Sequence, residues 1–223
     1  GLHRAQTDAA ATYGIRSQLI MCFIREMSAT SATETLDMAD PYKDWIVGVG
    51  LDSNEKGNPP EKFHAVFDDA RSRGYKLTMH CDVDQENSLA HIWQCLDLIG
   101  VDRIDHGVNC LEDDRLVEEI KKRRLGLTVC PISNEYCTDG TKATAIKTML
   151  DKELLVTVNS DDPSYFQSYI TENFLRVQRE INLNSSEIIR LVKNAFEVSW
   201  LEANARATYL DQVDAFVAAN SLP

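Results

Sequence analysis

The sequence predicts an α/β fold in which parallel strands alternate with helices, because three observations agree. Six short segments are apolar enough to be strands that are buried on both faces. Their ends recur every 25 to 29 residues, and amphipathic helical patterns occupy several of the intervals. Several of the strands end in His or Asp, which would gather these side chains at one edge of the sheet. A repeat of strand and helix at this short period has the (β/α)8 barrel as its closed form.

The expected strands are uninterrupted apolar runs at Ser17–Arg25, Trp45–Asp52, Tyr75–Cys81, Val101–His106, Leu125–Ile132 and Leu154–Asp161. Apolar residues at helical spacing predict helices at Pro60–Arg73, Ser88–Ile99 and Asp113–Arg123. Helix-terminating glycines follow these helices, or begin the next strand, at Gly74, Gly100 and Gly126. The elements therefore follow one another as strand, helix, strand along most of the chain.

The chain after Pro163 contains no further strand pattern, so helices are expected to wrap the bottom or the outside of the barrel. One of them is indicated by the capping sequence Asn184-Ser-Ser-Glu187. Six strands fall short of the eight in a barrel and would leave two exposed edges. Either the sheet is open and doubly wound or two strands precede Gly1; we favour the second, because the chain starts within a helical pattern and without Met. We expect one domain over 1–223, with barrel strands three to eight in roughly 15–163 and C-terminal helices in 164–223.

The composition of the 223 residues, 43% hydrophobic and 26% charged, is that of an ordinary globular protein. A formal net charge of −12 argues against nucleic acid or an anionic membrane as partner and favours a small molecule. No apolar run is long enough to span a bilayer. The six cysteines form no CxxC pair and several lie in apolar strands, so we expect reduced thiols and a cytoplasmic protein.

Three strand ends carry the candidate chemistry, at His80, at His106 and at the pair Asp161 and Asp162. Taken singly, a His at a strand end is more often structural, and an Asp before Pro163 is a common helix start. On one parallel sheet, together, they favour a site that binds a metal or moves protons. Adjacent carboxylates in a strand point to opposite sides, so one can face a metal while the other meets a substrate. The strand ends thus predict a metal-dependent hydrolase.

Four motifs then make the chain recognisable, in the order GVGLDSNEKGNPPEKF, RIDHGVNCLED, TVCPISN and VTVNSDDP. With CFIREMSATSATETL, they resemble the adenosine and adenine deaminase family of the amidohydrolase superfamily, from about Ile15 to about Asn204. The first motif is closer to the adenine-deaminase-like branch. The resemblance implies a zinc-dependent hydrolysis of an aminopurine (adenine, adenosine or an N6-substituted relative) that leaves a 6-oxopurine and ammonia.

In that family, one zinc ion is held by two histidines of the first strand, one of the fifth and an aspartate of the eighth. The resemblance implies that His80 and Asp161 are the metal ligands here, Asp161 being thereby also catalytic. It also implies that His106 orients the attacking hydroxide and that Asp162 accepts a hydrogen bond from the purine. Zinc suits the reaction because it lowers the pKa of bound water to about 7; iron is the alternative metal.

The chain departs from the family pattern in two places. The first-strand HxH pair is not in this sequence, so we expect it upstream of Gly1 or on a separate N-terminal fragment. The chain alone would then be inactive, unless the protein is a non-catalytic relative. Val83 stands where the family has the glutamate that protonates purine N1, which leaves Asp82 or Asp84 as the general acid. This second departure also points to an N6-substituted or otherwise unusual aminopurine.

Weaker candidates surround these residues. Four loop residues lie where the family contacts the purine edge, namely Asp52, Ser53, Asn54 and Glu55. An ordinary polar loop is an equally good interpretation of them. Ser133 and Asn134 match the strand-seven motif, and we expect them to stiffen a loop through side-chain-to-backbone bonds. The rival functions are another amidohydrolase, which cleaves an amide, an ester or an N6-alkylamino group, and a barrel that only binds a partner. The sequence leaves a homo-oligomer open.

Overall fold

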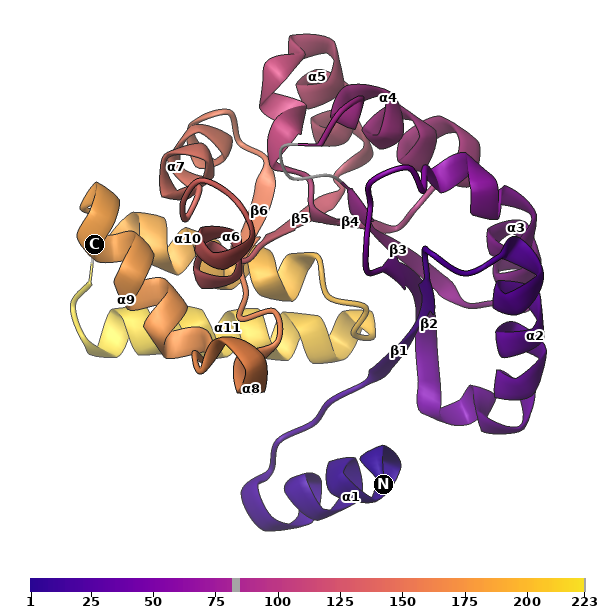
Figure 1. The fold of residues 1–223 in the computed structure, drawn as a ribbon. Helices are drawn as coiled ribbons and strands as arrows, with labels where there is room; N and C mark the ends of the chain where they lie inside the picture. Colours follow the sequence, from indigo (N-terminus) through magenta and orange to yellow (C-terminus); the bar gives the residue numbers. More distant parts are fainter. Residues whose placement is uncertain (82–84, 223) are drawn as a thin grey trace.

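The computed structural model describes residues 1–81 and 85–222. Its centre is one parallel sheet in which six strands lie in chain order. The strands are β1 (Leu19–Ile24), β2 (Ile46–Asp52), β3 (Lys76–Cys81), β4 (Arg103–His106), β5 (Gly126–Val129) and β6 (Leu155–Val158). Figure 1 shows them side by side as a curved sheet with helices on its outer side. The predicted parallel α/β architecture is confirmed.

The helices before and between the strands are α1 (Leu2–Tyr13), α2 (Ala29–Ala39), α3 (His64–Ser72), α4 (Ser88–Trp93), α5 (Asp114–Arg123), α6 (Pro131–Cys137) and α7 (Ala143–Asp151). Those after β6 are α8 (Pro163–Phe166), α9 (Ile170–Ile181), α10 (Ser185–Glu197) and α11 (Ala203–Ala219). Shorter turns of 3-10 helix are η1 (Asp40–Trp45), η2 (Pro60–Phe63) and η4 (Val108–Glu112), and η3 (Gln94–Ile99) is a π-helical segment. No helix in the described ranges combines the length and the apolar character that crossing a membrane requires.

Several strand boundaries differ from the prediction: β1 begins at Leu19, β4 begins at Arg103 and β6 ends at Val158. The apolar run Leu125–Ile132 is a strand only to Val129, because Pro131 occupies the first turn of α6. Proline lacks an N–H and fixes its φ angle near the helical value, so it starts a helix at no cost in hydrogen bonds. Ser133 and Asn134 therefore lie in a helix and not in the loop that we expected.

The predicted cap of α10 is confirmed in detail. The side chain of Asn184 accepts a hydrogen bond from the N–H of Glu187 at 3.0 Å, and the Glu187 carboxylate accepts one from the N–H of Asn184 at 2.8 Å. This capping box satisfies two of the N–H groups that the first turn of a helix leaves without partners. The sequence signal and the structure agree because the interaction is local.

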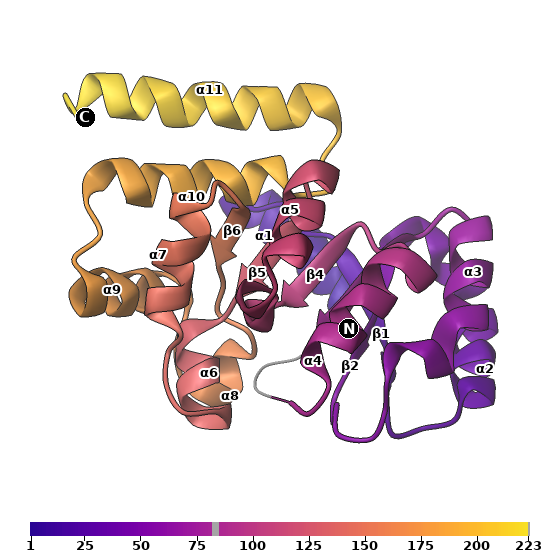
Figure 2. The same cartoon turned by 90° about the horizontal axis from the view of Figure 1, so that it is seen from above.

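The C-terminal segment covers the end of the sheet at which the strands begin, as predicted. A Cβ atom on Gly126 would lie 2.5 Å from Val198 Cβ, and one on Gly48 would lie 2.5 Å from Trp200 Cζ3. Arg103 at the start of β4 stacks its guanidinium on the Trp200 ring at 4.3 Å. Figure 2 shows α11 running beside α10 on the side away from the sheet. Because this end is closed, the opposite ends of the strands remain for a site.

The two edges of the sheet are β1 and β6, each paired with one neighbour in the part of the chain that the structure describes. The helix α1 stands apart from the sheet on an extended segment (Figure 1) and buries none of its residues. Its contacts include His3, whose ring stacks on Trp45 with centroids 4.1 Å apart. The six strands therefore form an open part of a barrel, and not a closed one.

Candidate active site

A cleft of about 710 Å³ opens where the strands end. It brings together ten of the residues that the sequence singled out, namely Asp52, Ser53, Asn54, Glu55, His80, His106, Ser133, Asn134, Asp161 and Asp162. Ser133 and Asn134 belong to α6, and the others come from the ends of β2, β3, β4 and β6, which parallel pairing places at one edge of the sheet. The candidates Asp82 and Asp84 lie outside the described residues. Residues that are distant in the sequence thus share one cavity, while their individual roles stay predictions.

Three of the cleft residues have left-handed backbone conformations. The φ angle is +77° at Ser53, +62° at His106 and +57° at Asp161. L-residues adopt this region at a cost of about 1–2 kcal/mol, and such strain gathers at functional sites. Each residue lies at or just after a strand end, where the chain turns sharply out of the sheet.

His106 is almost fully enclosed, with 7% of its surface exposed. Its Nε2 lies 3.8 Å from Oδ2 of Asp161, and its ring meets that of His80 edge to face with centroids 4.8 Å apart. Burial, and then the neighbouring His80, lowers the pKa of His106 to about 4, although Asp161 acts in the opposite direction. His106 is therefore neutral at pH 7 and able to accept a proton.

Asp161 is held by a neighbouring helix. Its Oδ2 accepts a hydrogen bond of 2.6 Å from Oγ of Ser133, which is 3% exposed. We expected Ser133 to bond to the backbone of a loop; it bonds instead to a candidate metal ligand. The cause is the position of Ser133 in α6, which starts at the end of β5 beside β6.

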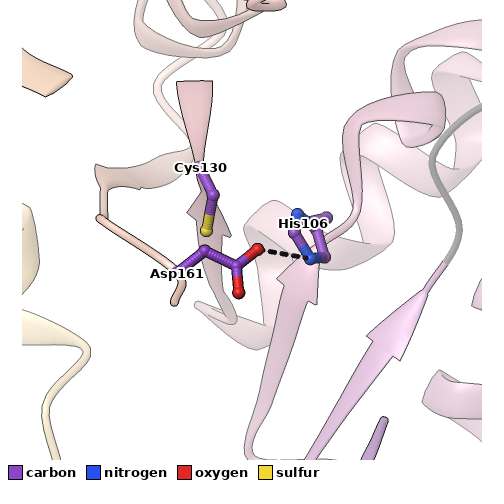
Figure 3. Close-up of side chains that lie close together, drawn as sticks. All are labelled: His106, Cys130 and Asp161. Atoms are coloured by element: carbon purple, nitrogen blue, oxygen red, sulfur yellow. Dashed lines mark ion pairs between the residues drawn. The ribbon is translucent and has the colours of Figure 1, made fainter. Parts of the chain in front are cut away.

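The donor atoms at this edge suit a metal ion. Among the described residues, the ligand atoms of His106, Cys130 and Asp161 lie within 4.8 Å of one another (Figure 3). His80 lines the same cleft, and the buried Nδ1 of His106 has no hydrogen-bond partner in the described part of the chain. Burial first, and then the charge of Asp161, raises the pKa of Cys130 well above its usual value. The imidazoles and the carboxylate form a donor set that fits zinc.

Two more acids lie near the histidines. Burial raises the pKa of Asp52, and the charge of Asp162 adds to the effect while His80 opposes it. Asp105 is a functional candidate that the sequence analysis missed: its carboxylate accepts hydrogen bonds from Thr78 at 2.6 Å and from Thr128 at 2.9 Å. Burial is the largest effect and acts against its charged form, but Arg103, His80 and the two threonine hydrogen bonds together outweigh it and hold the pKa of Asp105 below its usual value. The signal was a charged residue inside a short buried strand.

A smaller cavity of about 280 Å³ adjoins the cleft on the inner face of the sheet, where Asp105 and His80 both contribute to its wall. Arg25 is the second residue that was missed. It is completely buried behind the cleft wall, and its guanidinium donates to the backbone carbonyl of His80 at 2.7 Å. The sequence signal was again a charge that follows directly on an apolar strand.

Known proteins resemble this chain over nearly its whole length. The family profile described as Adenosine deaminase matches residues 1–216. An uncharacterized deaminase of Schizosaccharomyces pombe is 49% identical over 220 residues, which are 98% of this chain and 65% of the relative. An adenine deaminase of Psychrobacter cryohalolentis is 45% identical over 216 residues, which are 96% of this chain and 64% of the relative. The chain thus spans slightly less than two thirds of the length of these relatives.

Solved structures show the same architecture. An adenine deaminase from Arthrobacter aurescens superposes with a TM-score of 0.91 at 34% identity, covering 97% of this chain and 66% of that one. A zinc-bound amidohydrolase from Burkholderia ambifaria (TM-score 0.84, 23% identity, 98% and 63% covered) shares the fold. So does an N6-methyl-AMP deaminase from Arabidopsis thaliana (TM-score 0.76, 21% identity, 90% and 59% covered). The open sheet is therefore part of the barrel that the adenine deaminase shows, and the chain is an adenine-deaminase-like member of the adenosine deaminase family.

Proposed function

We propose that the complete protein hydrolyses the 6-amino group of an aminopurine, adenine foremost, to a 6-oxopurine and ammonia. The observation that carries the proposal is that His80, His106, Asp161 and Asp162 share one cleft at the ends of parallel strands. The adenine deaminases that are 45% and 34% identical to the chain support adenine as the substrate.

We propose zinc as the metal, with His80 and Asp161 of this chain among its ligands. Their imidazole and carboxylate donors suit zinc, and the zinc-bound amidohydrolase supports the same choice. When bound, zinc supplies hydroxide at neutral pH because it lowers the pKa of water to about 7. Metal analysis of the purified protein distinguishes zinc from iron.

The residues of the chain divide the remaining work. His106, which is neutral at pH 7, orients the attacking water and accepts its proton. Asp162 accepts a hydrogen bond from an N–H of the purine, and the loop from Asp52 to Glu55 lies along the purine edge. Protonation of purine N1 stays assigned to Asp82 or Asp84, where the family has its glutamate.

The charge of the cleft favours an uncharged purine over a nucleotide. Its wall holds four carboxylates, those of Asp52, Glu55, Asp161 and Asp162. None of the residues in the described ranges that line it is Lys or Arg. A phosphate group would face these charges without a cationic partner. Although the fold also accommodates an N6-methyl-AMP deaminase, the side chains here support adenine, adenosine or an N6-substituted adenine.

We also propose that two further strands complete the site, because β1 and β6 leave the sheet open in the described part of the chain. These strands would come from the remainder of the full-length protein or from a separate N-terminal fragment, and would carry the HxH pair. The six cysteines, which form no CxxC pair in the sequence, support a reducing compartment such as the cytoplasm. Sedimentation of the full-length protein would reveal a homo-oligomer.

The decisive experiment follows ammonia release by the zinc-loaded full-length protein from adenine, adenosine and AMP, and methylamine release from N6-methyladenine. We expect turnover of at least one uncharged purine, with AMP the poorest substrate, and loss of turnover after chelation that zinc restores. If no aminopurine releases ammonia, the proposal is wrong. Binding of a purine without turnover would favour the non-catalytic alternative, and release of an alkylamine from an N6-alkyl purine alone would favour the other amidohydrolase.

A further inference from the structure

Arg25 is the largest side chain that the structure buries completely. It follows β1 directly, and its backbone N–H donates to the carbonyl of Asp52 at 3.1 Å. The β1–β2 pairing thereby extends one residue beyond the strand. A guanidinium is always charged, and burying it is unfavourable unless polar groups surround it. The contacts of Arg25 therefore show what the burial achieves.

The guanidinium joins two segments that contribute to the cleft wall. Its Nη1 donates to the carbonyl of His80 at 2.7 Å, at the end of β3. Its Nε donates to the carbonyl of Asn58 at 3.1 Å, in the loop that follows β2. Nη1 also lies 3.6 Å from Oε1 of Glu55 in the same loop. Lys62 closes the arrangement, because its Nζ donates to the carbonyl of Arg25 at 2.7 Å and to Oδ1 of Asn58 at 2.9 Å.

The arrangement is a poor device for stability alone. Nη2 of Arg25 is buried and has no hydrogen-bond partner among the described residues. A buried donor without a partner loses its solvation, and apolar residues of similar volume are often as stabilising as a buried ion pair. What an apolar residue cannot provide is the fixed geometry of a planar fork that bonds two carbonyls at once.

The two segments that the guanidinium bonds matter because both contribute side chains to the cleft. The side chains of His80 and Glu55 line the cavity, whereas Arg25 does not. A shift of about 1 Å in a positioning element can lower a reaction rate about a hundredfold. We propose that Arg25 is a positioning residue, which fixes the Glu55 loop relative to the strand end of His80 and so sets how tightly the aminopurine is held. The proposal rests on the proposed function for its substrate, but the placement of the loop does not depend on it.

The kinetic test uses the zinc-loaded full-length protein with Arg25→Lys, Arg25→Gln, Glu55→Gln and the double variant Arg25→Lys/Glu55→Gln. We expect Arg25→Gln to raise KM for adenine at least about tenfold, and Arg25→Lys to lie between it and the wild type, because lysine retains the charge but not the fork. The double variant should be no worse than its worse single change, since both disturb one element. Zinc content should stay at the wild-type value in all of them.

Arg71→Gln is the matched control, because Nη2 of Arg71 also donates to backbone carbonyls, those of Ile99 and Gly100, away from the cleft. Its KM should equal that of the wild type. If Arg25 were only structural, its variants would lose thermal stability while KM stayed unchanged. The effects of the two single changes would then add in the double variant. That result would overturn the proposal. Should Arg25→Gln fail to fold, Arg25→Lys and Glu55→Gln carry the comparison.

Hydrogen exchange tests the same proposal without a substrate. The backbone amides of residues 53–58 should exchange faster in Arg25→Lys than in the wild type and in Arg71→Gln. Faster exchange in a protein that deaminates no purine would leave the positioning role standing and remove the proposed function. Unchanged exchange together with unchanged KM would remove the positioning role and leave the function.

Discussion

Ser133 on α6 donates a hydrogen bond of 2.6 Å from its Oγ to Oδ2 of Asp161, in the turn after β6. A hydroxyl that bonds a carboxylate at this distance makes a charge-assisted bond, which is stronger than a neutral one. Partners of this kind fix the orientation of carboxylates that bind metals. The helix after one strand thus presets the side chain at the end of the next.

Replacing Ser133 by Ala should weaken zinc binding about 10- to 100-fold, because Asp161 loses the bond that orients it. Competition with a chromophoric chelator measures the zinc affinity of the full-length protein. Ser72→Ala is the control, since Ser72 is exposed and its Oγ donates to the carbonyl of Asp69. Equal affinities in the two variants would show that the bond does not prepare a metal ligand.

Asp161→Ala and His106→Ala should separate metal binding from proton transfer. We expect Asp161→Ala to lose zinc and activity together, and His106→Ala to keep zinc while kcat falls by about a hundredfold or more. Zinc stoichiometry and ammonia release, measured on the same samples, decide the matter. Loss of zinc from His106→Ala would make His106 a ligand, as its closeness to Asp161 and Cys130 permits. Activity in both variants would refute the assignment of the strand ends.

The pH dependence of stability should reveal the buried His106. Its pKa is about 4 in the folded protein against an ordinary value of 6.5, so between these values the unfolded chain binds a proton that the folded one does not. The free energy of unfolding of the metal-free protein should therefore fall as the pH drops from about 6.5 to about 4, and the contribution is intact above that window. Urea unfolding across this range should show a smaller pH slope for His106→Gln than for the wild type; equal slopes would contradict the prediction.

Gly107→Ala should destabilise the protein by about 1–3 kcal/mol beyond the cost of its left-handed backbone. Its φ is +71°, and an added Cβ would lie 2.7 Å from Leu127 Cδ2 and 3.0 Å from Ile104 Cγ2. Gly57→Ala is the matched control, because its φ is +73° and a Cβ there meets nothing within 4 Å. Urea unfolding of both variants isolates the steric part of the loss in stability. Equal losses would mean that the core side chains beside His106 move to make room for the added methyl group.

The strand ends could be predicted because strands buried on both faces are apolar throughout, so the first polar residue marks the exit from the core. That argument located His80, His106 and Asp161, and the resemblance to a known family named their roles. It failed at Leu125–Ile132, where the apolar character continues from strand into helix and only Pro131 marks the change. An apolar run indicates that a segment is buried, and burial alone does not distinguish a strand from a helix.

The contacts of Ser133 and Arg25 could not be predicted for a different reason. Ser133 and Asp161 are 28 residues apart and Arg25 and His80 are 55 apart, so their hydrogen bonds depend on how neighbouring strands pack. A local pattern carries no information on such pairs, whereas the cap of Asn184 on Glu187 is local and was predicted. For Arg25 the sequence showed a charge at a strand end, but not that the chain folds over it.

The left-handed residues Ser53, His106 and Asp161 set a limit on how this protein can be improved. Glycine at these three positions would relieve about 1–2 kcal/mol of strain each, a large share of the ~5–15 kcal/mol by which domains are usually stable. Every such exchange would also delete a side chain from the cleft. Selection for thermal tolerance and selection for turnover therefore pull these positions in opposite directions, and a thermostable descendant with an intact cleft must gain its stability elsewhere.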